Sequence, residues 1–297
     1  MKAKVYYIVD VFAEKKYAGN QLAVFRGGKE LFSDEEMQLI AKEMNFSETT
    51  FILSDEPETN GYNVRIFTPA REVPFAGHPT LGTAYIIQRE IIKQPIKVVN
   101  LNLKVGQIPI DLFYNSSEEL EMLIMKQKEP TFGSELSRES LSTVLNIDKN
   151  EIDDRVPIQE VSTGIPFIIV PLRTLSSTKR IKVNKEEYFK LIENTEAKAI
   201  HVFCPETQHK ENQIHVRMFA DYYGVPEDPA TGSAAGCLAA YLVKHKYFGK
   251  NKIDIRAEQG YEIGRPSLLF LKAEETENKI DVYVGGKVQM VAKGDFL

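Results

Sequence analysis

The sequence predicts an α+β protein of two similar halves, each a β-sheet or barrel wrapped around a central buried helix. Each half contains one run of small and apolar residues, 79–88 and 229–244, in which Lys244 is the only charge. A helix without a polar face is a buried one. Short segments of alternating polarity, typical of strands, dominate the rest. We expect an N-terminal half over 1–128 and a C-terminal half over 129–297, the last strands of which can return to the first half.

The two halves also repeat one another in sequence. At an offset of 228 − 78 = 150, HPTLGTA at 78–84 matches DPATGSA at 228–234. Upstream, VRIF at 64–67 matches VRMF at 216–219. Helix, strand, strand, loop and buried helix recur in the same order. A repeat of about half the chain indicates an internal duplication, because it is too long for a solenoid unit.

The expected elements follow from local signals in chain order. Strands need alternation bounded by turn residues, and helices need caps such as Ser33 with Glu36 or Asn184 with Glu187. The expected strands cover 4–12, 22–25, 49–53, 63–67, 96–99, 107–112, 121–126, 199–203, 252–258 and 268–273. Residues 160–170 contain a strand broken by Gly164 and Pro166, and 280–291 are hairpin-like around Gly285-Gly286. Further helices are expected from Ser33, over 137–146 and from Lys185, and 129–134 is the most linker-like segment.

The central helices are expected to begin at capped prolines. His78 and Asp228 are the predicted N-caps, and Pro79 and Pro229 fit the first helical position because proline has no N–H to satisfy there. The buried N-terminus of each helix carries free N–H groups and a partial positive charge. Such an end attracts an anion, either a side chain or a substrate carboxylate.

These helix ends are candidate binding groups. If the halves pack about a pseudo-twofold axis, both ends can face a cleft between domains, where ligand sites tend to lie. The backbone N–H groups of Gly77, Gly232 and Ser233 can then hold a carboxylate. Capping alone explains Asp228, whereas histidine is a poor cap, so for His78 a structural and a functional role both stay open.

Glu48 is the candidate acid–base group. It lies between an apolar helix and an apolar strand, and a carboxyl in apolar surroundings has a raised pKa that suits proton transfer. A solvated loop glutamate is the other interpretation. The corresponding position in the second half falls near Lys198 and Ala199, so there is no second glutamate. A single base suits a proton shuttle on one face of a substrate, whereas a two-base racemase needs another.

Composition excludes several classes of function. The 297 residues are 43% apolar and 27% charged, with a scattered net charge of −5, so neither nucleic acid nor a membrane is an expected partner. The N-terminal apolar run contains Asp10 and no cleavage site, unlike a signal peptide. Cys204 and Cys237 are expected to be reduced core residues of a cytoplasmic protein.

No motif indicates a metal or a cofactor. His201, His209 and His215 have no compact metal-ligand spacing. The glycines of 77–83 resemble a phosphate loop that lacks its lysine. Arg65 and Arg217, repeated in the two halves, are expected to form structural ion pairs.

Several long motifs then resemble the phenazine-biosynthesis PhzF-like family almost end to end. They are Gly19-Asn20, 43–51 (EMNFSETTF), 65–69 (RIFTP), 74–79 (PFAGHP), 227–236 (EDPATGSAAG) and 259–268 (QGYEIGRPSL). The resemblance implies the diaminopimelate-epimerase-like fold, two pseudo-symmetric halves, a homodimer and cofactor-free isomerisation. It matches the family's proton-moving glutamate to Glu48, its assisting histidine and aspartate to His78 and Asp228, and its anion-holding residues to Gly77, Gly232 and Ser233. Asn20 is a further expected substrate-binding residue.

Two segments depart from the family. Gln21 stands where many relatives carry proline, and 162–167 (STGIPF) is less polar than the corresponding segment of the phenazine enzyme. Neither 75–79 nor 228–232 contains the cysteine that diaminopimelate epimerases use. The expected function is therefore a cofactor-independent isomerase of a small carboxylate-bearing metabolite. An amino- or hydroxy-acid racemase or epimerase on the same scaffold, and a catalytically silent metabolite-binding protein, are the alternatives.

Overall fold

The protein divides into two compact units. The computed structural model describes residues 4–27, 31–277 and 279–296. Unit 1 contains Met1–Met125 and Gly285–Leu297, and unit 2 contains Lys126–Val284. The expected division at 128/129 therefore shifts to 125/126, and the C-terminal segment from Gly285 belongs to unit 1. Residues 1–3 and 297 of the expected halves lie outside the described residues.

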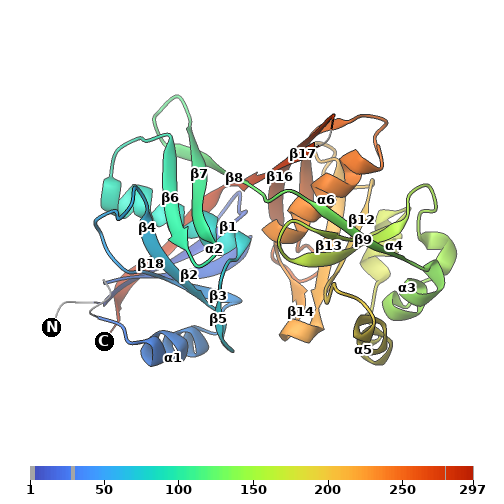
Figure 1. The fold of residues 1–297 in the computed structure, drawn as a ribbon, viewed down its shortest axis with the longest axis horizontal. Helices are drawn as coiled ribbons and strands as arrows, with labels where there is room; N and C mark the ends of the chain where they lie inside the picture. The colour runs from blue at the N-terminus through green and yellow to red at the C-terminus, as the bar shows by residue number, and fades with distance from the viewer. Residues whose placement is uncertain (1–3, 28–30, 278, 297) are drawn as a thin grey trace. The chain divides into compact units, whose positions relative to one another are not determined.

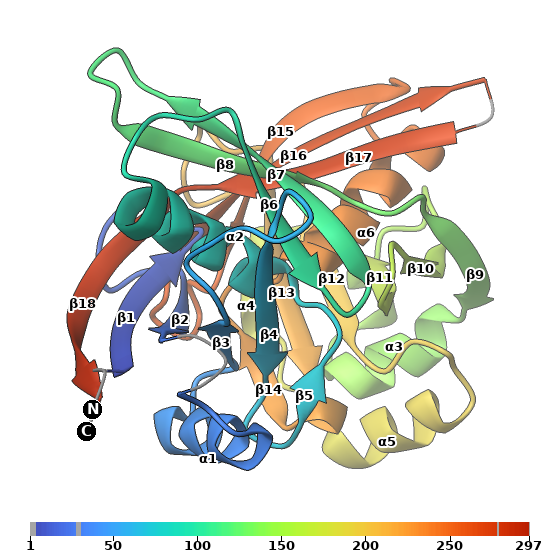
Figure 2. The ribbon, with the colours of Figure 1, turned by 60° about the vertical axis from the view of Figure 1, so that its left-hand side comes forward.

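Unit 1 is built on a mixed sheet. Paired neighbours follow the order β18, β1, β2, β3, β4, β6, β7, β8, and β5 also pairs with β4. The pairs β2–β3 and β4–β6 are parallel and the others are antiparallel. Figure 2 shows β18, β1 and β2 side by side. The bounds are β1 Lys4–Val11, β2 Asn20–Arg26, β3 Glu48–Ile52, β4 Tyr62–Phe67, β5 Glu72–Val73, β6 Val98–Leu103, β7 Gly106–Tyr114, β8 Leu120–Lys126 and β18 Val288–Phe296.

The central helix of unit 1 is α2 (Gly77–Ile86), and all of its residues are buried. It packs against β1, β2, β3, β6 and β18, so the sheet curves around it (Figure 1). The helix begins two residues before the expected 79–88 and passes into a π-helical turn, Ile87–Ile92. Gly82 permits close packing, because a Cβ there would lie 2.6 Å from Leu22 Cδ2 and 2.9 Å from Val11 Cγ2.

A second layer covers the other face of this sheet. Helix α1 (Asp34–Met44) is capped by Ser33, whose hydroxyl accepts a hydrogen bond from the Glu36 N–H at 3.2 Å. This confirms Ser33 as the N-cap, whereas the carboxylate of Glu36 contacts Lys4. Under the helix lies a cluster of stacked and edge-on rings from Phe25, Phe51 and Phe67. Unit 1 thus has apolar cores on both faces of its sheet.

Unit 2 repeats this plan, with β9 beside β10 as β18 is beside β1. Its strands pair in the order β9, β10, β11, β12, β13, β15, β16, with β14 also on β13. The expectation of a linker at 129–134 was wrong, because 131–136 is a strand that pairs with β10. The bounds are β9 Thr131–Leu136, β10 Ile158–Ser162, β11 Pro166–Pro171, β12 Ile200–Cys204, β13 Ile214–Ala220, β14 Val225–Asp228, β15 Lys252–Gln259, β16 Ser267–Thr276 and β17 Lys279–Gly286.

Helices lie on both faces of this second sheet. The central helix α6 (Gly232–Lys244) packs against β10, β11, β15 and β16. The opposite face is covered by α3 (Arg138–Leu145), α4 (Leu175–Arg180) and α5 (Lys185–Glu193), which share an apolar cluster with β11 and β12. Short turns of 3₁₀ helix lie at Lys149–Glu151 and Asp221–Tyr223.

One core side chain of unit 2 is a buried histidine. His201 on β12 is fully buried, and neither ring nitrogen has a hydrogen-bond partner among the described residues. Its neighbours Ile200 and Val202 belong to the apolar cluster shared with α3, α4 and α5, so the His201 side chain points to the opposite face of the sheet, where α6 lies. Phe203 points to the same face, and its ring centroid lies 5.9 Å from that of Tyr241 in α6. Burial lowers the pKa of His201 to about 3. The imidazole is therefore neutral in the folded protein.

We expect this buried imidazole to make the fold acid-sensitive. Its folded-state pKa lies below the ordinary value, so it binds fewer protons than in the unfolded chain, and its contribution to stability is lost as the pH falls from about 6.5 towards 3. Between pH 7 and pH 5 the wild type should lose about 2 kcal/mol more unfolding free energy than His201→Leu. Urea denaturation at both pH values measures this difference. An equal loss in both proteins would contradict the expectation.

A glycine-to-alanine change should lower the free energy of unfolding more in α2 than in α6. Alanine favours an isolated helix by about 1 kcal/mol. In Gly82→Ala the new methyl group meets buried branched side chains, so we expect a net loss of about 1–3 kcal/mol from overpacking. In Gly236→Ala, the matched control, its nearest neighbours are atoms of one side chain, Gln127, at 3.0 Å and beyond, so we expect a smaller loss. Denaturant unfolding of both variants tests this, and a stabilised Gly82→Ala would contradict tight packing of α2.

Candidate active site

Unit 1 brings together a carboxylate and a buried imidazole. Glu48 is the first residue of β3, and His78 lies in the first turn of α2. Their side chains are 19% and 6% exposed, and His78 Nε2 lies 3.5 Å from Glu48 Oε2. This separation is slightly longer than a hydrogen bond, and His78 Nε2 has no hydrogen-bond partner among the described residues. The arrangement has the residue types that proton transfer requires.

The start of β2 completes this group. Parallel pairing of β2 with β3 sets Leu22 beside Glu48, and Asn20, buried, begins the same strand. The Gln21 backbone forms a hydrogen bond with the His78 ring. Before them, Gly19 has φ +68°, and a Cβ there would lie 2.3 Å from the Val11 carbonyl oxygen. Only glycine fits this turn, which holds Asn20 and Gln21 at one edge of the sheet with Glu48.

His78 is neutral at physiological pH. Burial lowers its pKa to about 3, and the hydrogen bond with the Gln21 backbone only partly opposes this shift. A neutral imidazole can donate a hydrogen bond from one nitrogen while the other accepts one. Next to Glu48 it can therefore assist proton transfer without forming a permanent ion pair.

The predicted capping of α2 was wrong. Ala76, with an extended backbone, is the N-cap, and the helix begins at Gly77. His78 and Pro79 therefore occupy the second and third helical positions. The first turn of a helix has no intrahelical acceptor for its N–H groups, so proline is tolerated throughout that turn. His78 therefore does not cap the helix. The backbone N–H of Gly77 lies at the helix N-terminus, as expected.

The predicted capping of α6 was wrong for a different reason. Asp228 ends β14 and pairs with Met218, and α6 begins at Gly232 after the N-cap Thr231. The Asp228 carbonyl accepts a hydrogen bond from Gln259 Nε2 at 2.9 Å, so it is engaged outside the helix. The Ala235 N–H instead donates to the Thr231 carbonyl at 2.9 Å.

The second unit nevertheless gathers its predicted residues at one corner. The carboxylate of Asp228, buried, accepts a hydrogen bond from the Thr231 hydroxyl. Gly232 and the half-buried Ser233 follow as the first residues of α6. Asp228, Gly232 and Ser233 therefore share the β14–α6 corner of unit 2, whereas Glu48, His78, Gly77 and Asn20 belong to unit 1.

The structure also corrects how the two halves correspond. Arg65 forms a bidentate pair with Glu72, and Arg217 forms the same pair with Glu227, which confirms both arginines as structural ion pairs. The two glutamates differ by 227 − 72 = 155. The N-caps Ala76 and Thr231 also differ by 155. The helices therefore correspond at an offset of 155 and not 150.

At this offset Gly77 corresponds to Gly232, and His78 corresponds to Ser233. The match of HPTLGTA with DPATGSA aligns residues that occupy different positions relative to the start of each helix. Sequence likeness was misleading here because proline and small residues suit both the approach to a helix and its first turn.

Only one half carries the candidate base. Phe51 pairs with Arg65 in unit 1, and Val202 pairs with Arg217 in unit 2, an offset of 202 − 51 = 151. The position equivalent to Glu48 is thus 48 + 151 = 199, which is Ala199, fully buried and apolar. The duplicated scaffold therefore supplies no second glutamate at this position.

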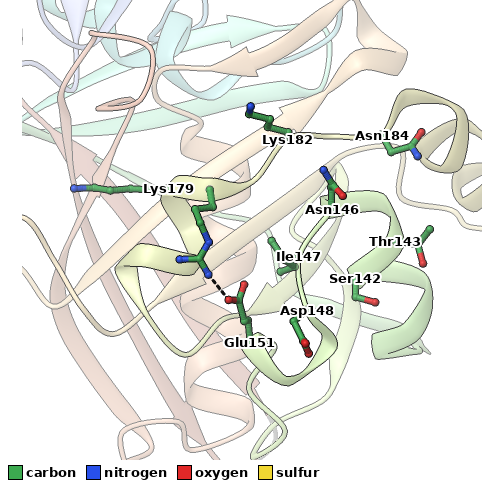
Figure 3. Close-up of a pocket in the computed structure, with 10 residues that line it drawn as sticks. Ser142, Thr143, Asn146, Ile147, Asp148, Glu151, Lys179, Lys182 and Asn184 are labelled. Atoms are coloured by element: carbon green, nitrogen blue, oxygen red, sulfur yellow. Dashed lines mark hydrogen bonds and ion pairs between the residues drawn. The ribbon is translucent and has the colours of Figure 1, made fainter.

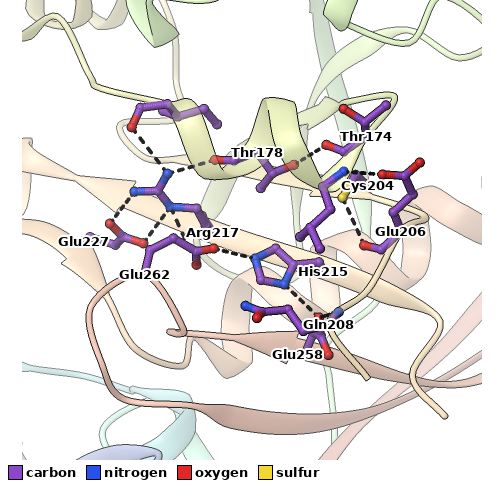
Figure 4. Close-up of polar contacts among 12 residues, drawn as sticks. Thr174, Thr178, Cys204, Glu206, Gln208, His215, Arg217, Glu227, Glu258 and Glu262 are labelled. Atoms are coloured by element: carbon purple, nitrogen blue, oxygen red, sulfur yellow. Dashed lines mark hydrogen bonds and ion pairs between the residues drawn. The ribbon is translucent and has the colours of Figure 1, made fainter. Parts of the chain in front are cut away.

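A buried charge network supports the corner of unit 2 (Figure 4). The Glu258 carboxylate lies 2.9 Å from His215 Nδ1, and Glu262 lies 3.1 Å from Nε2. Burial alone would lower the pKa of His215, but these two carboxylates reverse the effect and raise it. Arg217 continues the network to Glu227, next to Asp228. His215 and Arg217 lie two positions apart on β13, so their side chains share one face of the sheet. Their role in this network was not predicted from the sequence.

A depression on unit 2 contains none of the candidate residues. It has a volume of about 750 Å³ and is lined by residues of α3, α4 and the segments that follow them (Figure 3). Arg180 forms an ion pair with Glu151 at its wall. In the described parts of the chain, no group of three or more His, Cys, Asp or Glu side chains is placed to hold a metal ion. Likewise, no described helix is long and apolar enough to cross a membrane.

Comparison with known proteins gives this geometry a context. Residues 9–294 match the family described as "Phenazine biosynthesis-like protein". The trans-2,3-dihydro-3-hydroxyanthranilate isomerase of Pseudomonas aeruginosa is 33% identical over 97% of this chain and 98% of its own length. A PhzF-family protein of Bacillus anthracis superposes with a TM-score of 0.89 at 29% identity, covering 100% of both chains.

A more distant neighbour shares the fold alone. A hydroxyproline epimerase of Agrobacterium vitis superposes with a TM-score of 0.65 at 9% identity, covering 100% of this chain and 91% of the other. The chain thus has the diaminopimelate-epimerase-like fold predicted from its sequence. It belongs to the phenazine biosynthesis-like (PhzF) family and is an isomerase.

Proposed function

We propose that this isomerase moves a proton on a small carboxylate-bearing metabolite without a cofactor, and that Glu48 carries the proton. The observation that carries the proposal is the 3.5 Å approach of the Glu48 carboxylate to the buried His78 imidazole. A carboxylate removes a proton from carbon, and the resulting carboxylic acid returns it at another carbon of the same conjugated system. Two such steps shift a double bond and leave the enzyme unchanged.

His78 assists this transfer as a neutral group. Its lowered pKa, about 3, leaves it able to donate a hydrogen bond to an oxygen that gains charge as the proton leaves. The absence of a carboxylate at Ala199, within the described part of unit 2, supports a one-base transfer. A racemase with two opposed bases would need a second acid–base group there.

The remaining assignments concern binding. We assign Asp228 a supporting catalytic role, and Gly77, Gly232, Ser233 and Asn20 to substrate binding. The N–H groups at helix starts favour a carboxylate ligand, and Gly77 and Gly232 are the first residues of α2 and α6. The relative from P. aeruginosa is named for an anthranilate, which is a carboxylate. Family membership supports a homodimer, and the free, buried Cys204 and Cys237 support a cytoplasmic location.

Replacement of the proposed base tests the function directly. We expect Glu48→Gln to lower turnover about 10²–10⁴-fold, because the amide keeps the shape of the side chain but cannot take a proton. Trans-2,3-dihydro-3-hydroxyanthranilate is the first probe, followed by other small unsaturated carboxylates. Incubation in deuterated water with NMR detection reports both isomerisation and label uptake.

The matched control is Glu43→Gln, because Glu43 is an exposed carboxylate near the end of α1. It should exchange label at the wild-type rate. If Glu48→Gln incorporates deuterium as fast as the wild type, Glu48 is not the proton carrier.

A further inference from the structure

Gln259 lies at the junction between the buried charge network and the β14–α6 corner of unit 2. It is the last residue of β15 and is fully buried. Its neighbour Glu258 contacts His215. Because side chains alternate along a strand, Gln259 points to the opposite face, where Thr231 and α6 lie. No part of the mechanism above uses this amide.

The amide of Gln259 makes three hydrogen bonds to the corner. Its Oε1 accepts from the Thr231 N–H at 3.2 Å. Its Nε2 donates to the Asp228 carbonyl at 2.9 Å and to the Thr231 hydroxyl oxygen at 3.2 Å. The opposite amide orientation would set N–H against N–H and oxygen against oxygen. The backbone therefore fixes which end of the amide donates.

This orientation gives the hydrogen-bond chain a direction. The Thr231 hydroxyl has one hydrogen, and its oxygen accepts from Gln259. The hydrogen therefore points to the Asp228 carboxylate, with which the hydroxyl is in hydrogen-bond contact. The contacted carboxylate oxygen acts as an acceptor and carries no proton. Thus Gln259, through Thr231, holds the carboxyl group of Asp228 in one orientation.

The next residue fixes the position of this junction. Gly260 has φ +78°, and a Cβ there would lie 2.3 Å from the Arg265 carbonyl oxygen and 2.6 Å from the Pro229 carbonyl oxygen. Only glycine permits the end of β15 to pass so close to Pro229. The contact of Gln259 with the corner is therefore set by the backbone as well as by the side chain.

We propose that Gln259 is a positioning residue of the isomerase site, which orients Asp228 and the first turn of α6 through the Thr231 backbone and hydroxyl. The inference rests on the proposed function only in its kinetic consequence. The hydrogen-bond chain itself is open to a separate physical measurement.

The physical test is amide hydrogen exchange of the full-length protein, followed by NMR. In Gln259→Leu the Thr231 N–H loses its acceptor, so we expect its exchange rate to rise at least about tenfold while amides of β12 keep their rates. Gln259→Glu keeps an acceptor oxygen but lacks the amide NH₂ group that donates to Asp228 and Thr231, so Thr231 should stay protected. The matched control is Gln213→Leu, because Gln213 also bridges two backbone groups, at Glu211 and Arg256, but is exposed.

The kinetic test uses the same variants. Both Gln259→Leu and Gln259→Glu should lower kcat about 10²-fold with little change in KM, because misorientation of an assisting group acts on the transition state. Gln213→Leu should retain the wild-type kcat. Thr231→Val should reproduce the kcat loss, and Thr231→Ser, which restores the hydroxyl, should recover activity relative to it.

The outcomes separate the two proposals. Unchanged Thr231 exchange in Gln259→Leu, or an unchanged kcat in both Gln259 variants of an active enzyme, overturns the positioning role. A fall in kcat that Gln213→Leu shares equally also overturns it, because the effect would then be general. If Glu48→Gln still catalyses deuterium uptake into the substrate at the wild-type rate, the proposed function fails. The amide hydrogen exchange rate of Thr231 still decides whether the hydrogen-bond chain exists.

Discussion

The fold depends on burying two helices that have no polar face. Helix α2 is buried at every residue, and α6 is buried at every residue except Ser233 and Lys244. Such helices can pack only if apolar strands surround them, and the curved sheets of the two units meet this requirement. Burial also leaves the N–H groups of each first turn in an apolar setting, where they favour an anionic partner.

The two units share a scaffold but carry different residues at corresponding positions. In both units an arginine pairs with a glutamate on the short strand before the central helix, Arg65 with Glu72 and Arg217 with Glu227. These pairs fix the approach to the helix. The candidate base is not repeated, since Glu48 in unit 1 corresponds to Ala199 in unit 2. The duplication thus repeats the frame and not the proposed base.

Several buried polar groups hold the β14–α6 corner of unit 2 in place. Burying the carboxylates of Glu258 and Glu262 on either side of the His215 imidazole costs desolvation energy that only good hydrogen bonds offset. The network holds β13 and β15 together at the point where Arg217 meets Glu227. On the other face of β15, Gln259 fixes Asp228 and Thr231. Both faces of one strand therefore hold the same corner.

The sequence by itself determined the class of fold, the family and the identity of the candidate residues. The uncharged runs predicted the buried helices, because hydrophobic pattern is a local property that survives in one dimension. The N-cap role of Ser33 and the structural role of the two arginines were also predicted, since they follow from residues close in sequence. Glu48 was expected just before the strand at 49–53, and it is the first residue of that strand.

Tertiary structure alone decided the helix starts, the correspondence of the halves and the buried networks. The Asp228 carbonyl is engaged by Gln259, 31 residues away, so α6 starts later than its proline suggests. The 155-residue offset became visible only through the paired strands that carry Glu72 and Glu227. Hydrogen bonds between distant strands leave no periodic trace in sequence, so His215 and Gln259 acquired their partners only in the folded chain.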